Sequence, residues 1–526
     1  MLSEATKLSL TLRDFDESKV GLCAGCGCSC GYIAYFKKGR LVDIYGDPSE
    51  PRGMGSLCTK GLTYIHQIPQ NPLRLKGIFL RKEEFEEVDY KTAINIIKDK
   101  LSKGKTAFLL GRQSGLEDYL TALQLGEVFV DAPVIDFLPS TIPFTWWNQA
   151  KLILSVDAEP VFSEVMSARF LIDAIEKGAY LVCLSSRYET LCAKANKRLL
   201  LKPDRMLAFL RGVVSPEKGD ELTEFIKRSF FLIKGSLVLV GSHLFNSPFR
   251  SELTYLLSEL KRKFHINYSI VGDVMPFRAK ELKDFFERIE DFENIVVVGN
   301  VLRYLGRREL EALKSKFVIS FELFPNLTAN NSDLVFGLKN FSEREFINYR
   351  HGFGFLTYSP QVILPEDGFY TLSEVFSDAF RVENKTEEFL RDYGVELNEL
   401  KSSKNGIMLR MKSIEESAFE VEEYAKEGLY VHTAPSLVEE LGHWNPWTHE
   451  IEQRQRAYIN PKTAREHHLR DKVEINGVEF ELVESVNVAE GVIYISSEYE
   501  EFQPFNPGVS VGMFLKTPYY RYETLT

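Results

Sequence analysis

The fold is decided by the stretch Cys23-Ala24-Gly25-Cys26-Gly27-Cys28-Ser29-Cys30, together with the more distant Cys58. Four of these cysteines read C-x2-C-x3-C followed by a distant C, which is ligand spacing for a cubane iron–sulfur cluster. Three thiolates on one tight loop and a fourth from a returning segment can surround a [4Fe–4S] centre. The glycines between them let the backbone wrap closely around the inorganic core. We therefore predict that Cys23, Cys26, Cys30 and Cys58 bind the cluster.

Two other uses of the cysteines were weighed. A set of disulfides is disfavoured, because cysteines so close together cannot all pair and nothing else in the chain is typical of a secreted protein. A four-cysteine zinc site usually has two C-x2-C knuckles, and here Cys58 stands alone. Cys28 is surplus and is expected to be a bystander, with replacement of Cys26 or Cys30 as the alternative. Cys183 and Cys192 are expected to be small buried hydrophobic residues.

The composition excludes several classes of protein. The chain has 526 residues, 44% of them hydrophobic and 26% charged, as in a globular protein of several structural units. A formal net charge of −11 and the lack of a Lys/Arg-rich run argue against nucleic acid as the main partner. No apolar run is long enough to span a bilayer. The first residues show neither an apolar signal region nor a twin arginine, so a cytoplasmic location is expected.

The predicted elements group into four units. Residues 1–75 form the iron–sulfur unit, in which residues 31–47 read as a hairpin turning at Lys38-Gly39. Residues 76–385 open with an amphipathic helix from Tyr90 to Leu101 and continue as an α/β region. Residues 386–427 are charged and helical in pattern and connect it to residues 428–526. This last unit has a hairpin about Asn476-Gly477 and is expected to be a β-barrel.

The α/β region alternates short apolar runs with helical ones, which predicts a parallel sheet with helices on both faces. In such sheets ligands bind beyond the carboxyl ends of the strands. The predicted strands are 106–111, 152–157, 179–184, 237–241, 295–299 and 317–322. Their ends carry no G-x-G-x-x-G and no Walker motif, so the strand ends alone indicate a nucleotide only weakly.

Together these motifs resemble the molybdenum/tungsten bis-pterin oxidoreductases, the DMSO reductase superfamily. Cys58-Thr59-Lys60-Gly61 is similar to the family's cysteine-x-lysine-glycine, whose lysine relays electrons between cluster and pterin. Residues 152–160 with 179–187 approximate the family's first dinucleotide-binding unit. Residues 458–464, with Lys472-Val473 and residues 491–494, resemble its pterin-binding barrel. The ending, with Asn506 and residues 515–522, looks most like formate dehydrogenase.

The resemblance implies a fold and a set of cofactors. The fold is α/β: a small N-terminal [4Fe–4S] domain, dinucleotide-binding domains with parallel sheets over residues 76–385, with two interleaved domains as one possibility, and a C-terminal β-barrel. The cofactors are the cluster and two molybdopterin guanine dinucleotides holding Mo or W. A dinucleotide needs amides for phosphate and polar side chains for the purine edge. The residues of suitable type are Gly111, Asp157, Glu159, Pro160, Ser185, Arg187, Gly299, Asn300 and Glu322 in the α/β region, and His432, Thr433, Asn506 and Lys516 in the barrel.

The sequence departs from the family where the metal should be bound. Family members with a protein ligand place Cys, selenocysteine, Ser or Asp ahead of the second strand, but residues 136–150 contain no cysteine and no histidine follows. Ser140 or Asp136 could supply oxygen, and a short structural crossover is the alternative. The catalytic residues therefore stay unknown.

Two functions from different classes fit. One is a redox enzyme that exchanges two electrons with a small substrate, formate and CO2 being favoured, and passes them to a partner with further clusters or a flavin. The other is a non-catalytic electron-transfer or scaffold subunit, similar to the large peripheral subunit of respiratory complex I, in which the metal has been lost. A plain nucleotide-binding module with a zinc site is the third and weakest possibility.

Overall fold

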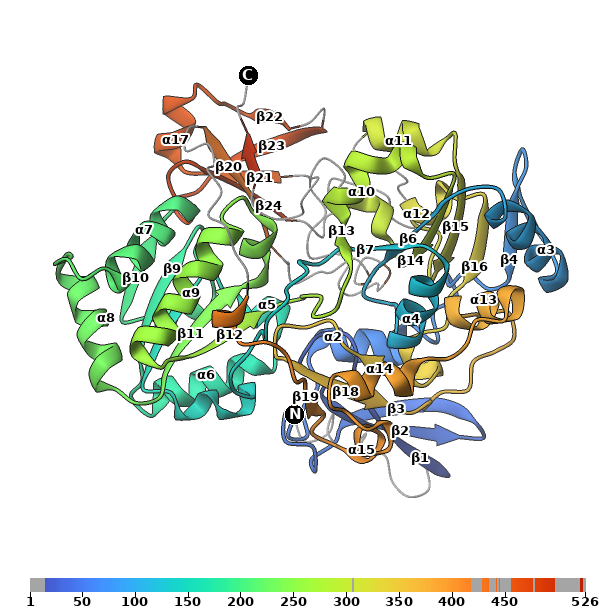
Figure 1. The fold of residues 1–526 in the computed structure, drawn as a ribbon, viewed down its shortest axis with the longest axis horizontal. Helices are drawn as coiled ribbons and strands as arrows, with labels where there is room; N and C mark the ends of the chain where they lie inside the picture. The colour runs from blue at the N-terminus through green and yellow to red at the C-terminus, as the bar shows by residue number, and fades with distance from the viewer. Residues whose placement is uncertain are drawn as a thin grey trace, which may run out of the picture.

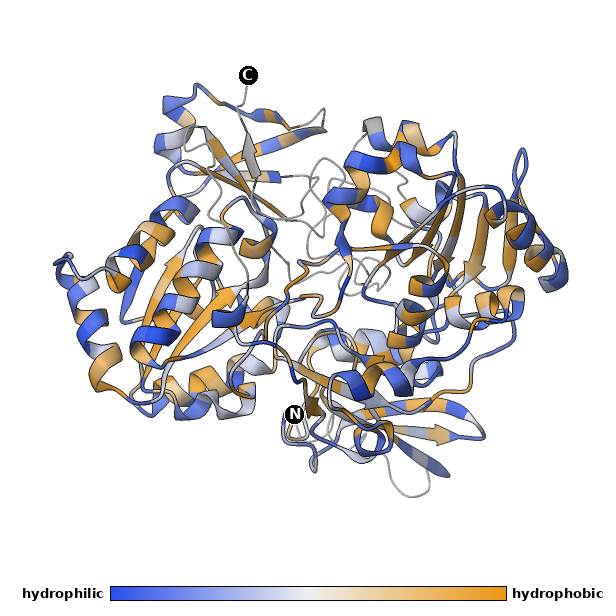
Figure 2. Ribbon diagram, in the orientation of Figure 1, coloured by the Kyte–Doolittle hydropathy of each residue, from blue (hydrophilic) through white to orange (hydrophobic). Residues whose placement is uncertain are grey.

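The computed structural model describes residues 15–304, 307–417, 428–434, 441, 444, 456–475, 478–496 and 521–523. Within them lie a small antiparallel sheet, two large α/β units and a C-terminal sheet (Figure 1). The strands of the two α/β units are the most hydrophobic parts of the ribbon, and the outer faces of their helices are polar (Figure 2). The predicted α/β fold class is confirmed.

The N-terminal sheet presents the cysteine loop. It has the order β1(Glu17–Leu22), β2(Gly31–Lys37), β3(Arg40–Gly46), and all its pairs are antiparallel. The predicted turn at Lys38-Gly39 is confirmed, with φ values of 51° and 74° at the two residues. The loop from Cys23 to Cys30 joins β1 to β2. Cys58 caps α2(Thr59–Leu62), which runs into η2(Thr63–Gln67).

The first α/β unit is a five-stranded parallel sheet of order β10-β9-β8-β11-β12. Helices α7, α8 and α9 cover one face through apolar side chains, and α6 with η3 covers the other. Its strands and helices are β8(Leu152–Val156), α5(Pro160–Ser163), α6(Ser167–Glu176), β9(Tyr180–Ser185), η4(Leu191–Lys194), β10(Lys197–Leu200), α7(Pro203–Val214), α8(Glu221–Leu232), β11(Ser236–Gly241), η5(Ser242–Asn246), α9(Arg250–Phe264) and β12(Asn267–Val271), preceded by η3(Phe144–Gln149).

The second α/β unit is an eight-stranded sheet of order β13-β7-β6-β14-β15-β16-β4-β5, parallel except for β4 and β5. Helices α3, α4 and α13 pack on one face, and α10 and α11 on the other. Its elements are β4(Ile78–Arg81), β5(Phe85–Glu87), α3(Tyr90–Leu101), β6(Thr106–Leu110), α4(Leu116–Leu125), β7(Glu127–Val130), β13(Lys280–Glu281), α10(Leu282–Arg288), η6(Ile289–Asp291), β14(Asn294–Val298), η7(Val301–Tyr304), α11(Arg307–Leu313), β15(Phe317–Glu322), α12(Leu327–Asn330), β16(Leu334–Gly337), η8(Phe341–Glu343) and α13(Leu372–Phe380).

The two α/β units are interleaved in the chain. The chain leaves the second sheet after β7, builds the whole first sheet between β8 and β12, and returns at β13. The predicted helix over 90–101 and all six predicted strands are present, within one residue at either end. Alternation of apolar runs cannot show that strands belong to two sheets, because the register of each strand depends on partners far away in the sequence.

The remaining elements tie the units together. A three-stranded sheet of order β17(Phe346–Asn348), β18(Phe355–Ser359), β19(Ile407–Met408) follows η8, and α14(Thr386–Asp392), α15(Leu397–Ser402) and η9(Ile414–Glu416) lie in the predicted connection. The connection therefore also contains a strand.

The C-terminal sheet has the order β22-β23-β21-β24-β20-β25, with β20(Leu429–Ala434), β21(Arg456–Ile459), α17(Pro461–Glu466), β22(Lys472–Ile475), β23(Val478–Glu484), β24(Val492–Ser496) and β25(Arg521–Glu523). None of the helices in the described part of the chain is long and apolar enough to cross a bilayer.

A buried ion pair joins the segment before β4 to the second α/β unit. Arg74 makes two hydrogen bonds to Glu343, of 2.7 and 2.9 Å, and both side chains are 3% exposed. We expect Arg74→Met to destabilise the fold by about 3 kcal/mol, because the Glu343 carboxylate would stay buried without its cation. Lys76→Met is the matched control, since its ion pair with Glu366 is exposed and should contribute less than about 1 kcal/mol. Urea unfolding of both variants measures the difference, and equal losses would contradict the prediction.

Candidate functional site: a cysteine loop between two sheets

The cysteine loop is buried at the meeting point of the N-terminal sheet and both α/β units. Cys23, Cys26 and Cys30 are buried and Cys58 is partly so. The thiol of Cys23 feels the charges of the other three, so the four predicted ligands lie close together. A Cβ on Gly61 would lie 3.7 Å from Cys23 Sγ, which shows how closely α2 approaches the loop.

The four thiols fit an iron–sulfur cluster chemically. Burial raises the pKa of Cys23 well above its usual value and that of Cys58 to about 12, so without metal these thiols hold their protons. Iron binds the thiolate form, so its binding displaces the protons. The positive iron then compensates the negative charge of the four buried thiolates. Cys28 is also buried, and its Sγ lies within 4.8 Å of the Cys26 Sγ, which places the surplus thiol beside the ligands.

Other parts of the chain hold the loop in place. Cys23 N–H donates to the Cys30 carbonyl (2.9 Å), which closes the loop on itself. Arg112, beyond the end of β6, donates to the Gly25 carbonyl (2.7 Å) and pairs with Asp273 at 2.8 Å. Asn348 on β17 donates to the Cys26 carbonyl (3.3 Å). The loop is thus held from both sheets, which the spacing of its cysteines could not show.

Glu164 is a functional candidate that sequence reasoning missed. Its Oε2 accepts the Cys28 N–H at 3.1 Å, and its Oε1 has no hydrogen-bond partner among the described residues. Burial raises the pKa of Glu164 to about 7, against the lowering effect of Arg112. Across Gly27 lies His351, whose pKa is lowered to about 3 by burial, so this imidazole is neutral. No local motif marks either residue, because each reaches the loop only through the tertiary fold.

Lys60 lies in α2, two residues after Cys58, and is 6% exposed. Its charge lowers the pKa of Cys26, Cys58 and Glu164, which places the ammonium beside both the cluster ligands and the carboxyl group. A buried ammonium in this position is unlike the solvated lysine of a surface turn. The geometry is consistent with the predicted relay role.

Each α/β sheet has one point where the strand order reverses. In the first sheet it lies between β8 and β11, and in the second between β6 and β14. Ligands of such sheets bind in the crevice at this point. Asp157 follows β8, whereas Gly111 and Gly299 follow β6 and β14, so these predicted residues stand at the two expected crevices.

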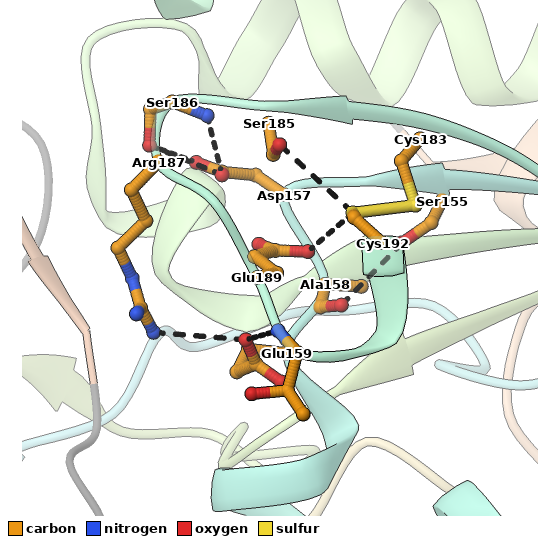
Figure 3. The surroundings of a disulfide bond; sticks show 11 residues. Ser155, Asp157, Ala158, Glu159, Cys183, Ser185, Ser186, Arg187, Glu189 and Cys192 are labelled. Carbon is orange, nitrogen blue, oxygen red and sulfur yellow. Dashed lines mark hydrogen bonds and ion pairs between the residues drawn. A yellow bond between two sulfur atoms is a disulfide. The ribbon is translucent and has the colours of Figure 1, made fainter. Parts of the chain in front are cut away.

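The first crevice has polar groups suited to a dinucleotide. Glu159 and Arg187, from the ends of β8 and β9, face each other at 3.9 Å (Figure 3). The Arg187 guanidinium also lies 4.6 Å from the ring centre of Tyr494 in the C-terminal sheet. Glu159 Oε1 and Arg187 Nε and Nη2 are buried and have no hydrogen-bond partner among the described residues. Buried groups of this kind need partners, and a purine edge and a phosphate would supply them. Pro160 starts α5, and Ser185 ends β9.

Asp157 turns away from that opening. It has φ +49°, accepts the Ser186 N–H at 2.9 Å, and lies 3.2 Å from His243 Nε2 (Figure 3 shows the Ser186 contact). His432 of β20 is 4.0 Å from the same carboxylate and bonds Ser186 Oγ through Nδ1. Although burial opposes it, hydrogen bonds from His243 and from the Ser186 N–H lower the pKa of Asp157, so the carboxylate is ionised. Burial lowers the pKa of His432, which is therefore neutral.

The second crevice is bordered by Gly299, which follows β14. Its φ of +80° is a left-handed backbone that favours glycine, and a Cβ there would meet the flexible end of the Gln113 side chain. Asn300 accepts hydrogen bonds from Thr328 N and Oγ1 (3.2 and 2.9 Å), and Glu322 accepts one from Asn326 (2.8 Å). These two predicted residues thus also serve the local turns.

The remaining predicted residues fall in three groups. Ser140 is buried and donates to the Ile142 carbonyl (2.7 Å), while Asp136 is exposed and accepts from Ser417 (3.1 Å). Thr433 follows His432 in β20, where only its backbone is described. Asn506 and Lys516 lie outside the described residues.

The expectation for Cys183 and Cys192 needs a correction. Both are buried, as predicted, but they form a disulfide that links β9 to η4 (Figure 3). The two thiols lie at the end of a strand and in the turn that follows, with Cα atoms 5.8 Å apart. Their separation of nine residues carried no signal, because pairing depends on how the chain turns after β9.

Comparisons with known proteins agree with the cysteine site and the fold. Residues 17–69 match the family model described as Molybdopterin oxidoreductase Fe4S4 domain. Among solved structures, the chain is similar to acetylene hydratase from Pelobacter acetylenicus, with a TM-score of 0.68 and 14% identity over 95% of this chain and 96% of that one. The predicted resemblance to the molybdenum/tungsten bis-pterin oxidoreductases is confirmed, with its three-part fold.

Curated relatives match over shorter stretches. Formate dehydrogenase 2 subunit alpha (cytochrome c-553) of Nitratidesulfovibrio vulgaris is 24% identical over 41% of this chain and 25% of its own length. F420-dependent formate dehydrogenase 1 subunit alpha of Methanococcus maripaludis is 24% identical over 39% of this chain and 34% of its own. The matches thus span a quarter to a third of these relatives. They support a [4Fe–4S] cluster and molybdopterin with Mo or W as cofactors.

Proposed function

We propose that this chain is the catalytic subunit of a molybdenum or tungsten bis-pterin oxidoreductase, with formate and CO2 as its favoured substrate pair. The observation that carries the proposal is the junction of three features: the buried cysteine loop, a buried Lys60 beside it, and two α/β units that each reach the loop, through Arg112 after β6 and through Glu164 after α5. Formate is favoured by the names of the curated relatives and by the C-terminal resemblance.

Within this proposal each group of residues has a task. Cys23, Cys26, Cys30 and Cys58 would hold the cluster, and Glu159 with Arg187 would bind one guanine dinucleotide at the first crevice. Gly111 and Gly299 would admit the second dinucleotide. When bound, the metal with its two dithiolenes supplies the two-electron chemistry. Lys60 would stabilise negative charge between cluster and pterin, and Arg112 would hold the cluster loop against the sheet.

A non-catalytic role is the second candidate, and a particular observation favours it. In the described segment 136–150, the Ser140 hydroxyl donates a hydrogen bond to a backbone carbonyl and Asp136 is exposed at the surface. Neither residue therefore offers an oxygen to a central metal. A subunit that kept the cluster and lost the metal would look the same here. The enzyme remains the better proposal, because buried Glu159 and Arg187 have polar atoms that a pterin dinucleotide would satisfy.

Elemental and pterin analysis of anaerobically purified protein decides between the two. The enzyme predicts about four iron atoms, one Mo or W and two pterins per chain. Iron without Mo, W or pterin would leave the electron-transfer subunit, and a colourless iron-free protein would end both. In either case electrons must leave through another protein, since the four-cysteine loop provides one cluster. We therefore also propose a partner with further clusters or a flavin.

A further inference from the structure

A cluster of two histidines and one aspartate lies at the reversal point of the first sheet. Asp157 follows β8, His243 lies in η5 directly after β11, and His432 comes from β20 of the C-terminal sheet. The side chains are 0%, 5% and 1% exposed. One carboxylate oxygen and one nitrogen from each ring all lie within 4.8 Å of one another. Three distant parts of the chain thus bring three metal-binding groups to one buried point.

We propose that Asp157, His243 and His432 bind a first-row divalent metal ion, with Zn²⁺ the best match. The proposed metal is distinct from the cluster iron and from Mo or W, and the inference does not depend on the pterin cofactors. Two imidazoles and a carboxylate, with one position left open, are a ligand set that zinc accepts. The set contains no sulfur, so it differs in kind from the cysteine loop.

The spacing fits tetrahedral coordination. Ligand atoms about 2.0 to 2.2 Å from zinc lie about 3.3 Å from each other. Asp157 Oδ2 is 3.2 Å from His243 Nε2 and 4.0 Å from His432 Nε2. All three ligand atoms lie within 4.8 Å of one another, so small movements of the two rings complete the set.

The contacts around the three residues orient them as metal ligands usually are. Ser186 Oγ lies 3.1 Å from both oxygens of Asp157 and bonds His432 through Nδ1, not Nε2. When the Ser186 hydroxyl donates to Asp157, its oxygen accepts from His432 Nδ1–H. The lone pair of His432 Nε2 then faces Asp157 Oδ2. A second hydrogen bond that fixes the tautomer of a ligating histidine is a common feature of metal sites.

Two further features suit a cation at this point. Two further carboxyl groups are buried nearby: Glu159 lies two residues after Asp157 and is 4% exposed, and Glu189 is 1% exposed. A divalent ion would offset this accumulation of carboxyl groups. A side chain at Gly241 would collide with both the His243 ring and the Asp157 backbone, so glycine is what allows the ring to reach the carboxylate.

Zinc K-edge absorption of the full chain, with metal analysis, tests the proposal. We expect about one zinc per chain, bound by nitrogen and oxygen only, with the outer-shell pattern of imidazole. His243→Ala and His432→Ala should each lower bound zinc tenfold or more, on the order of the loss seen when metal sites are disturbed. His265→Asn is the control, because His265 is exposed and asparagine tolerates its left-handed backbone.

Three results would overturn the proposal. One is wild-type protein that retains no first-row divalent metal besides iron after zinc is added and excess removed. Another is zinc bound through sulfur, which would place it in the cysteine loop and count against the proposed cluster instead. The third is a histidine variant that keeps its zinc but loses pterin, because the histidines would then be cofactor contacts. The wild-type spectrum decides even where a variant fails to fold.

Discussion

Cys23→Ala is expected to abolish the iron–sulfur cluster, with loss of nearly all bound iron and of the visible absorbance of the purified protein. A cubane needs four thiolates, and alanine offers no ligand in their place. Cys23 is buried between β1 and α2, with 6% of its surface exposed, so water cannot easily replace the missing sulfur. Iron and sulfide analysis with electron paramagnetic resonance of the reduced protein measures the effect.

Cys28→Ala is the matched control for the same loop. Cys28 is as buried as its neighbours, but its backbone N–H is already held by Glu164, and alanine keeps that hydrogen bond. We expect full iron content in this variant. A variant without Cys28 that loses its iron, while Cys26→Ala or Cys30→Ala keeps it, would show that Cys28 is the fourth ligand. A Cys23→Ala variant that keeps four irons would refute the assignment altogether.

Four cluster ligands could be proposed because three of the cysteines are close in sequence and thiolates are chemically specific, and the assignment of these four stays a prediction. The hairpin at Lys38-Gly39 and the helix over 90–101 could also be predicted from the sequence, since turn chemistry and helical periodicity are local. Strand positions were legible too, because fully buried parallel strands are continuous apolar runs. Two interleaved domains were one possibility for residues 76–385, but the apolar pattern alone could not assign the strands to two sheets, because strand pairing depends on segments that are distant in the sequence.

The rest of the site could not be read from the chain for a physical reason. Glu164 lies 136 residues from Cys28, to whose N–H it bonds, and His243 lies 86 residues from Asp157. A lone Glu after one helical turn or a lone His after a strand has no spacing to mark it. The reversal points that bring these residues together are set by strand order, which connections of variable length leave open. The strand-end rule did point to Asp157, Glu159 and Arg187, which the structure brings together after β8 and β9, and their binding of a dinucleotide stays a prediction.

Lys60→Gln is expected to reduce turnover by a factor of about 10² to 10³ while the cluster remains. This is the size of loss that follows when one preorganised donor is removed from an active centre. Glutamine keeps most of the side-chain volume in this 6% exposed position, so the fold should persist. The cluster should also become harder to reduce, because the ammonium that lies beside Cys26 and Cys58 stabilises added negative charge.

The relay role is separated from a structural one by two measurements on the same sample. A potentiometric titration gives the reduction potential of the cluster, and steady-state kinetics with formate and an artificial acceptor gives kcat and KM. Lys38→Asn is the control, since Lys38 is exposed at a left-handed turn that asparagine tolerates. We expect lower kcat with little change in KM and a more negative potential for Lys60→Gln alone. Unchanged potential with unchanged kcat would mean that Lys60 only packs between α2 and the loop, and the electron path would then have to leave the cluster through other residues.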